Sequence, residues 1–121
     1  MGLKISGLTK GLVFHDTVEG KRQTYYVFSS AREYFVMSLS ARKRNAGNFN
    51  TVRKASVTHV LRRLRGRQGA TARMVFERSR TPRLVPTRFS ALNILYILVA
   101  LGEAKVDTRH KSSELFFNVH S

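Results

Sequence analysis

Arginine is the residue whose type and spacing point most clearly to chemistry in this sequence. Residues 41–90 contain twelve arginines and two lysines but a single acidic residue, Glu77, so their net charge is 14 − 1 = +13. The planar guanidinium forms paired hydrogen bonds with phosphate oxygens and stacks on bases, which lysine does less well. A run of nearly one sign cannot neutralise itself, so we expect this stretch to contact a polyanion.

Ten of these basic residues surround the first two helices expected in this stretch. They are the candidate nucleic-acid-binding residues Arg42, Lys43, Arg44, Arg53, Lys54, Arg62, Arg63, Arg65, Arg67 and Arg73. Phosphate is the expected partner, and Gly66 and Gly69 would let backbone N–H groups approach it. The alternative is that some of these side chains only solvate the helices, and we expect about half of them to contact the ligand.

Aromatic side chains near the basic stretch are candidates for stacking on unpaired bases, as in single-strand-binding proteins. Tyr25 and Tyr26 are neighbours in an expected strand, so they must point to opposite faces of it. Phe49 lies between two asparagines in an expected loop. The alternative for the tyrosines is a place in the core of the N-terminal sheet, and for Phe49 a role as an anchor of the loop.

Residues suited to enzymatic chemistry are sparse. There are no cysteines, and the four histidines share no metal-ligand spacing with each other or with an acid, so we expect no metal site. A Glu-x-Lys spacing, as in some metal-dependent nucleases, occurs at 19–21 and 103–105, but such tripeptides are common by chance. No phosphate-binding loop or dinucleotide motif is present. We therefore expect neither enzymatic activity nor a cofactor.

The length and composition favour one folded domain over residues 1–121. The chain has 121 residues, a net charge of 22 − 7 = +15 and 42% hydrophobic residues, which is too apolar for a disordered basic tail. We expect neither a signal peptide nor a membrane partner, because the longest apolar stretch, Phe89–Leu101, falls short of the roughly 20 residues that span a bilayer. The expected location is the cytoplasm, in association with the nucleoid or with ribosomes.

The N-terminal part, residues 1–41, is predicted to be rich in β-structure. Leu12–Val18 and Gln23–Phe28 are predicted strands, and the turn between them makes a hairpin. The next piece, Ser30–Ala41, is ambiguous. Ser30 and Glu33 have the spacing of a capping box, which favours a helix, whereas alternating apolar residues from Phe35 onwards favour a third strand. We favour the helix, followed by a basic loop over residues 42–50.

The rest of the chain is predicted to form three helices and a hairpin. The first helix starts near Asn50 or Thr51 and stops at Gly66, and the second covers about 70–79. The third runs from about 88 to 101, between an N-cap at Thr87 and a stop at Gly102. Alternating residues at 104–108 and 115–119 predict two paired strands.

This order of elements, over residues 51–119, resembles the winged-helix family of nucleic-acid-binding proteins. The expected fold is therefore α+β: a small N-terminal sheet, then a three-helix winged-helix-like unit that ends in a β-hairpin. In that family the third helix presents polar side chains to the bases in the major groove. Here the helix 88–101 is apolar nearly all round, so we expect it in the core, with a homodimer through it as the alternative.

These expectations converge on a non-enzymatic nucleic-acid-binding protein. Because the third helix is too apolar to read bases, we expect largely sequence-tolerant binding to the phosphate backbone. DNA is slightly favoured, in single-stranded, architectural or regulatory binding. A ribosomal or other structural RNA-binding protein is the alternative, and a small metal-dependent nuclease is the second alternative.

Overall fold

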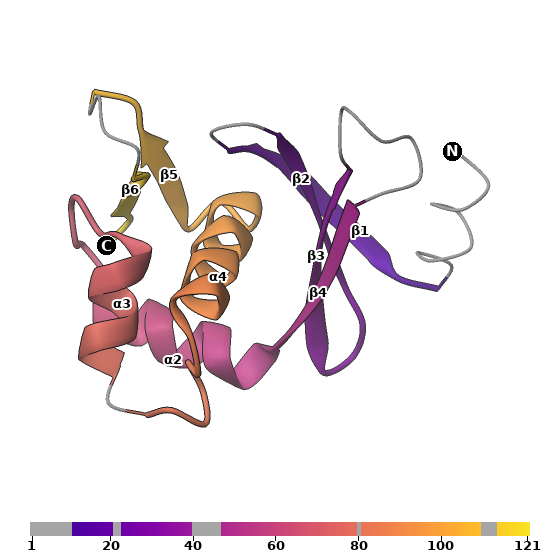
Figure 1. Cartoon of the computed structure of the whole chain (residues 1–121), viewed down its shortest axis with the longest axis horizontal. Coiled ribbons are helices and arrows are strands. Elements are labelled where there is room, and N and C mark those ends of the chain that lie inside the picture. Colours follow the sequence, from indigo (N-terminus) through magenta and orange to yellow (C-terminus); the bar gives the residue numbers. More distant parts are fainter. Residues whose placement is uncertain (1–10, 21–22, 40–46, 80, 110–113) are drawn as a thin grey trace.

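A computed structural model of the chain describes residues 11–20, 23–39, 47–79, 81–109 and 114–121. Its N-terminal half is a four-stranded antiparallel sheet in which strands adjacent in sequence pair with each other. The strands are β1 (Val13–Glu19), β2 (Thr24–Ser29), β3 (Glu33–Leu39) and β4 (Gly47–Arg53). Figure 1 shows this sheet on one side of the molecule, with the helices and a smaller hairpin on the other.

The sheet forms because alternate residues of its strands are apolar and face the helices. Val18, Val27, Val36 and Val52, one from each strand, are buried there in the main core. Their register agrees, since Val27 lies opposite Val36 across the ladder between β2 and β3. These four valines therefore mark the inner face of the sheet, and the residues that alternate with them lie on its outer face.

Three helices follow: α2 (Lys54–Leu64), α3 (Ala72–Ser79) and α4 (Arg88–Ala100). α4 is the centre of the fold, because it packs against α2, α3 and all four strands of the sheet. Ile94 and Ile97 have no exposed surface, and even the polar Asn93 is buried. The expectation that this helix is internal is confirmed, and a homodimer through it remains a prediction.

Both ends of α4 are set by the residues that the sequence indicated. The Thr87 hydroxyl accepts a hydrogen bond from the Ser90 backbone N–H at 3.0 Å, and the Ser90 hydroxyl lies 3.0 Å from the Thr87 backbone N–H. This reciprocal capping box satisfies two backbone donors at the start of the helix. At the other end, Gly102 adopts a φ of 77°, a left-handed conformation that ends the helix.

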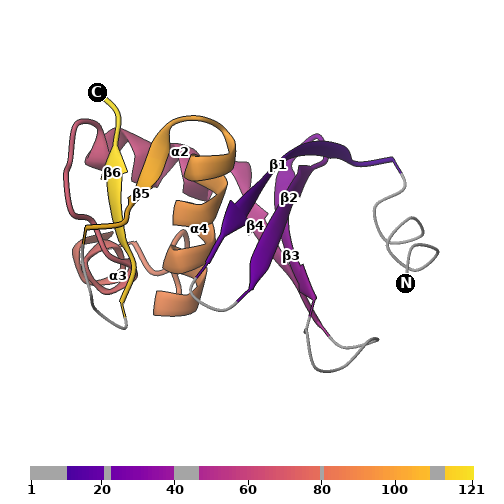
Figure 2. The ribbon, with the colours of Figure 1, turned by 90° about the horizontal axis from the view of Figure 1, so that it is seen from above.

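The chain ends in an antiparallel hairpin of β5 (Ala104–Asp107) and β6 (Phe116–Val119). Ala70, between α2 and α3, forms an isolated antiparallel bridge with Phe117 of β6. The bridge is closed by both backbone hydrogen bonds at 2.8 Å. The hairpin therefore fixes the connection between the first two helices, and Figure 2 shows it on the side of α4 away from the sheet.

The predicted helix over Ser30–Ala41 is wrong, because the described part of this segment contains strand β3. The Ser30 backbone N–H donates to the Glu33 carbonyl at 2.9 Å, so the residues that suggested a capping box close a tight turn between two strands. β3 then pairs along its length with β2 on one side and β4 on the other. Pairing on both edges outweighs the local helical signal.

The predicted basic loop over 42–50 is also too long, because residues 47–50 begin strand β4. Asn50 and Thr51 therefore do not cap a helix. Their backbones pair with β3, and α2 begins three residues later, at Lys54. The burial of Val52 in the core explains why the strand continues to Arg53. Within the described part of the chain, no helix has the length and apolar character needed to cross a membrane.

Candidate nucleic-acid interface

Four exposed arginines lie on or just after α2 and α3, and together they form the α2–α3 arginine surface. They are Arg62, Arg63, Arg67 and Arg78. Among the described residues, no carboxylate lies within 4.0 Å of any of these guanidinium groups. Their positive charge is therefore not neutralised by ion pairs within the described structure, and the groups are exposed to a ligand.

Two other arginines of the predicted set do have ion pairs. The Arg65 guanidinium lies 3.4 Å from the Glu103 carboxylate, and the Arg73 guanidinium lies 3.3 Å from the Glu77 carboxylate. Both pairs are well exposed, so each contributes at most about 1 kcal/mol to the free energy of unfolding. These arginines can still contact a ligand, but they lose an internal partner when they do.

The remaining predicted residues are not brought together with these. Arg53 and Lys54 lie at the opposite end of α2, where the Lys54 ammonium sits 5.3 Å from the centre of the Tyr34 ring. Arg42, Lys43 and Arg44 lie outside the described residues.

A pocket of about 120 Å³ lies between α2 and α3. Four apolar residues and five polar ones line this pocket. The apolar ones are Val60, Leu64, Met74 and Val75, and the polar ones are His59, Arg63, Arg67, Arg78 and Ser79. A second hollow, on the other side of His59 and Arg63, continues toward Arg62 and Leu84. The two hollows share His59 and Arg63 in their linings, so they adjoin along α2, and together they are called the α2–α3 groove.

Sequence reasoning missed Arg78. Arg78 is one turn after Met74 and His59 is one turn before Arg63, so in each case both side chains lie on one face of their helix. A helical-wheel plot of each helix would have placed its residues on one face of that helix. It would not have shown that the two helix faces line the same pocket.

The predicted stacking residues lie on different faces of the sheet, as their alternation required. Tyr25 is on the inner face, where its ring stacks on Tyr96 of α4 with centroids 4.2 Å apart. Tyr26 and Phe49 are on the outer face, each opposite Met37 of β3. Phe49 is 38% exposed and stacks on Phe35 at 5.3 Å. Tyr25 therefore belongs to the core, and base stacking by Tyr26 and Phe49 remains a prediction.

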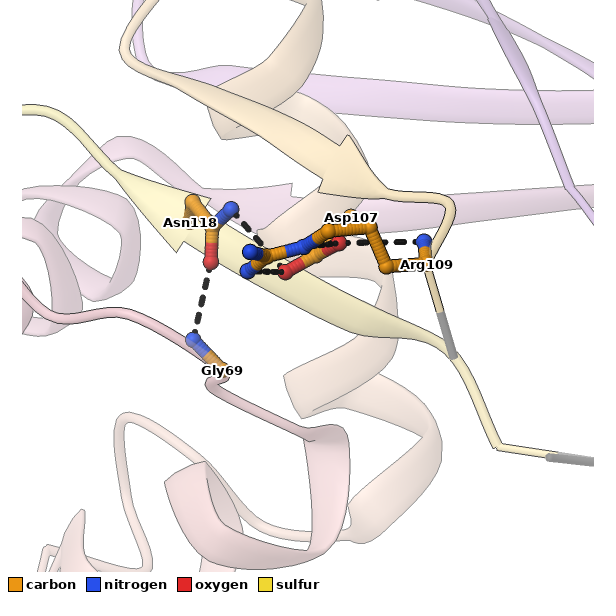
Figure 3. A network of polar contacts seen from close by, with 4 residues as sticks. All are labelled: Gly69, Asp107, Arg109 and Asn118. Carbon is orange, nitrogen blue, oxygen red and sulfur yellow. Dashed lines mark hydrogen bonds and ion pairs between the residues drawn. The ribbon is translucent and has the colours of Figure 1, made fainter. Parts of the chain in front are cut away.

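A polar network holds the C-terminal hairpin to the segment between α2 and α3 (Figure 3). The Asp107 carboxylate, whose side chain is only 3% exposed, accepts hydrogen bonds from the Arg109 guanidinium at 2.6 and 2.9 Å. It also accepts one from the Asn118 amide at 3.2 Å, while the Asn118 oxygen accepts the Gly69 N–H at 2.9 Å. These bonds hold the pKa of Asp107 well below its usual range.

Glu103, in the Glu-x-Lys spacing just before β5, and Asp107, at the end of β5, are each paired with an arginine. Among the described residues, no three His, Asp or Glu side chains are grouped so that they could hold a metal ion. The Asp107 network connects β5, β6 and the Gly69 turn.

Comparisons with protein-family models, with curated proteins and with solved structures found no match. The strongest evidence of function is the α2–α3 arginine surface with the α2–α3 groove.

Proposed function

We propose that this protein is a non-enzymatic nucleic-acid-binding protein that contacts the sugar–phosphate backbone through the α2–α3 arginine surface. One observation carries the proposal: four exposed arginines, without a carboxylate partner among the described residues, border the α2–α3 groove. Neighbouring like charges repel, so such a surface is stabilised by an anion with several charged groups. Nucleic acid carries phosphates at regular, closely spaced positions and meets this requirement.

The arrangement of the elements supports a winged-helix unit with one modification. In order, α2, the Ala70 bridge, α3, α4 and the β5–β6 hairpin follow the sequence of parts in that family. The sheet β1–β4 packs on α4, the helix that would otherwise enter the major groove. A covered helix cannot present side chains to base edges.

Binding through backbone contacts is therefore favoured over reading of the sequence. The arginines of α2 and α3 lie away from the sheet and remain accessible. We infer largely sequence-tolerant binding, with DNA slightly favoured and a structural RNA as the alternative ligand. Comparing the affinities for DNA and RNA distinguishes these two ligands.

The test is a salt titration of binding, measured by fluorescence anisotropy with labelled duplex DNA, single-stranded DNA and RNA of equal length. If ~6–8 phosphates are contacted, log affinity should fall against log salt with a slope of about −5 to −7. Replacing Arg63 and Arg78 together by alanine should make the slope shallower by about two and weaken all sequences alike. A slope near zero for the native protein would contradict the proposal.

The matched control removes the same two positive charges elsewhere. Arg32 and Lys105 are exposed and lie on the β2–β3 turn and on β5, outside the groove. Their double alanine variant should keep the native slope to within about half a unit, because screening confines such charges to a range of about 10 Å at 0.1 M salt. Equal losses in both double variants would show that net charge, and not the α2–α3 arginine surface, governs binding.

A further inference from the structure

The pocket between α2 and α3 has three layers of different chemistry. Its floor is apolar, because Val60, Leu64 and Val75 are almost completely buried. On one wall the His59 ring nitrogen and the Ser79 hydroxyl lie 3.5 Å apart, and Ser79 is itself only 4% exposed. The rim is formed by guanidinium groups. A pocket with this order suits a ligand that is flat and apolar at its tip and anionic where it joins the rest of the molecule.

The lining of the pocket narrows the choice of ligand. The recess of about 120 Å³ is partly open to solvent, so one group of a ligand can enter it while the rest of the ligand stays outside. A free phosphate would match the rim but would leave the apolar floor without a partner.

We propose that this pocket receives one unpaired nucleobase, while the phosphates on either side of it bind Arg63, Arg67 and Arg78. The proposal rests on the nucleic-acid-binding function above and specifies its ligand as a strand containing an unpaired base. Unpaired bases in other recognition pockets are held between apolar or aromatic side chains and read at their polar edge. Met74 and the floor residues supply the apolar contact here, and the His59–Ser79 pair supplies hydrogen-bonding groups.

A fully paired duplex would use only the rim, because its bases are stacked inside the helix. A duplex with a single bulged base would use both the rim and the pocket. The added contact is expected to strengthen binding about tenfold, within the range measured for stacking of a single base. Comparing the two duplexes therefore distinguishes binding in the pocket from binding to the α2–α3 arginine surface alone.

The first measurement uses the native protein and needs no variant. A 20-base-pair duplex with one bulged 2-aminopurine is compared with the same duplex without the bulge. We expect about tenfold tighter binding of the bulged duplex, and protection of the 2-aminopurine fluorescence from acrylamide quenching in the complex. Equal affinity with unchanged quenching would overturn the pocket proposal and leave the proposed function intact. Absence of binding to both duplexes would overturn the proposed function and the pocket proposal together.

The second measurement fills the pocket. Met74→Trp places a larger side chain in it without changing the charge, and Phe76→Trp makes a similar change at an exposed position of the same helix. Met74→Trp should remove the preference for the bulged over the plain duplex, whereas Phe76→Trp should keep that preference. An undiminished preference in Met74→Trp, with a native circular dichroism spectrum, would overturn the proposal. If that variant fails to fold, the quenching result on the native protein decides.

A free nucleotide could supply the same base and phosphate chemistry as a strand. Competition with about 1 mM nucleoside monophosphate, the upper end of typical KM values of enzymes for their substrates, distinguishes the two sources. We expect the bulged duplex to keep its preference over the plain duplex, because a strand also contacts the rest of the arginine surface. Loss of that preference would assign the pocket to free nucleotides and overturn a strand as its occupant.

Discussion

Removing the Tyr96 ring tests whether the sheet is fixed on α4, on which the proposed mode of binding depends. Tyr96 is 2% exposed and lies between two elements from different parts of the chain. Its ring stacks on Tyr25 of β2 at 4.2 Å and meets the edge of Phe117 of β6 at 6.1 Å. Burial and the hydrogen bond with Tyr25 raise the pKa of Tyr96, in keeping with a phenol removed from water.

The expected cost of Tyr96→Ala follows from what the ring contacts. Truncating a buried aromatic side chain to alanine lowers the free energy of unfolding by about 3–5 kcal/mol, since both burial and packing are lost. A domain of this length has a total of about 6–18 kcal/mol. The variant should therefore fold at low temperature but unfold at markedly lower urea concentration. In a double-mutant cycle with Tyr25→Ala, the coupling should be about 0.5–1.5 kcal/mol.

Urea unfolding followed by circular dichroism measures these quantities, with Phe89→Ala as the matched control. Phe89 is on the same helix but is 54% exposed, so its removal should change the free energy of unfolding by less than about 0.5 kcal/mol. A loss below about 1 kcal/mol for Tyr96→Ala, or no coupling to Tyr25, would refute the packing of the sheet on α4. The explanation of sequence-tolerant binding by coverage of α4 would then fail.

Two further predictions concern the N-terminus of α4 and the Asp107 carboxylate of β5. Thr87→Ala removes the side chain that caps α4 and should lower the free energy of unfolding by about 1 kcal/mol, seen as a lower melting temperature, whereas Thr87→Ser should nearly preserve it. Asp107 has a folded pKa below its unfolded value of about 3.9, so the unfolded chain binds more protons as the pH falls, and the stabilisation present above that value is lost in acid. Asp107→Asn should therefore flatten the decline in melting temperature between pH 5 and pH 2, and an unchanged acid decline would contradict a role for this carboxylate.

Local sequence signals predicted α4 and the terminal hairpin well. The capping residues of α4 and the glycine after it act within one turn of the helix, so their effect needs no distant partner. The apolar character of α4 all round also required burial whatever the neighbours were. The strands of the terminal hairpin were visible in their alternation, and the structure pairs Ala104 with Val119 as a hairpin should.

The strand β3 and the start of α2 were mispredicted because their conformation depends on partners. Ser30 and Glu33 fit a helix start locally, but the backbone between Glu33 and Leu39 gains hydrogen bonds from two neighbouring strands at once. Asn50 and Thr51 would cap a helix in isolation, and pairing with β3 draws them into β4 instead. The hydrogen bonds of a strand ladder pair backbone groups along the whole strand, so together they outweigh the single hydrogen bond of a helix cap.

The charge of the candidate site could be predicted from the sequence, whereas its shape could not. The sequence by itself determined that positive charge is concentrated in residues 41–90 and that arginine supplies most of it. Only the tertiary structure decided that Arg63 and Arg67 face Arg78 across one pocket, and that α4 lies behind the sheet. The physical reason is that charge is a property of composition, whereas a pocket exists only where separate helices pack on a common core and leave a gap between them.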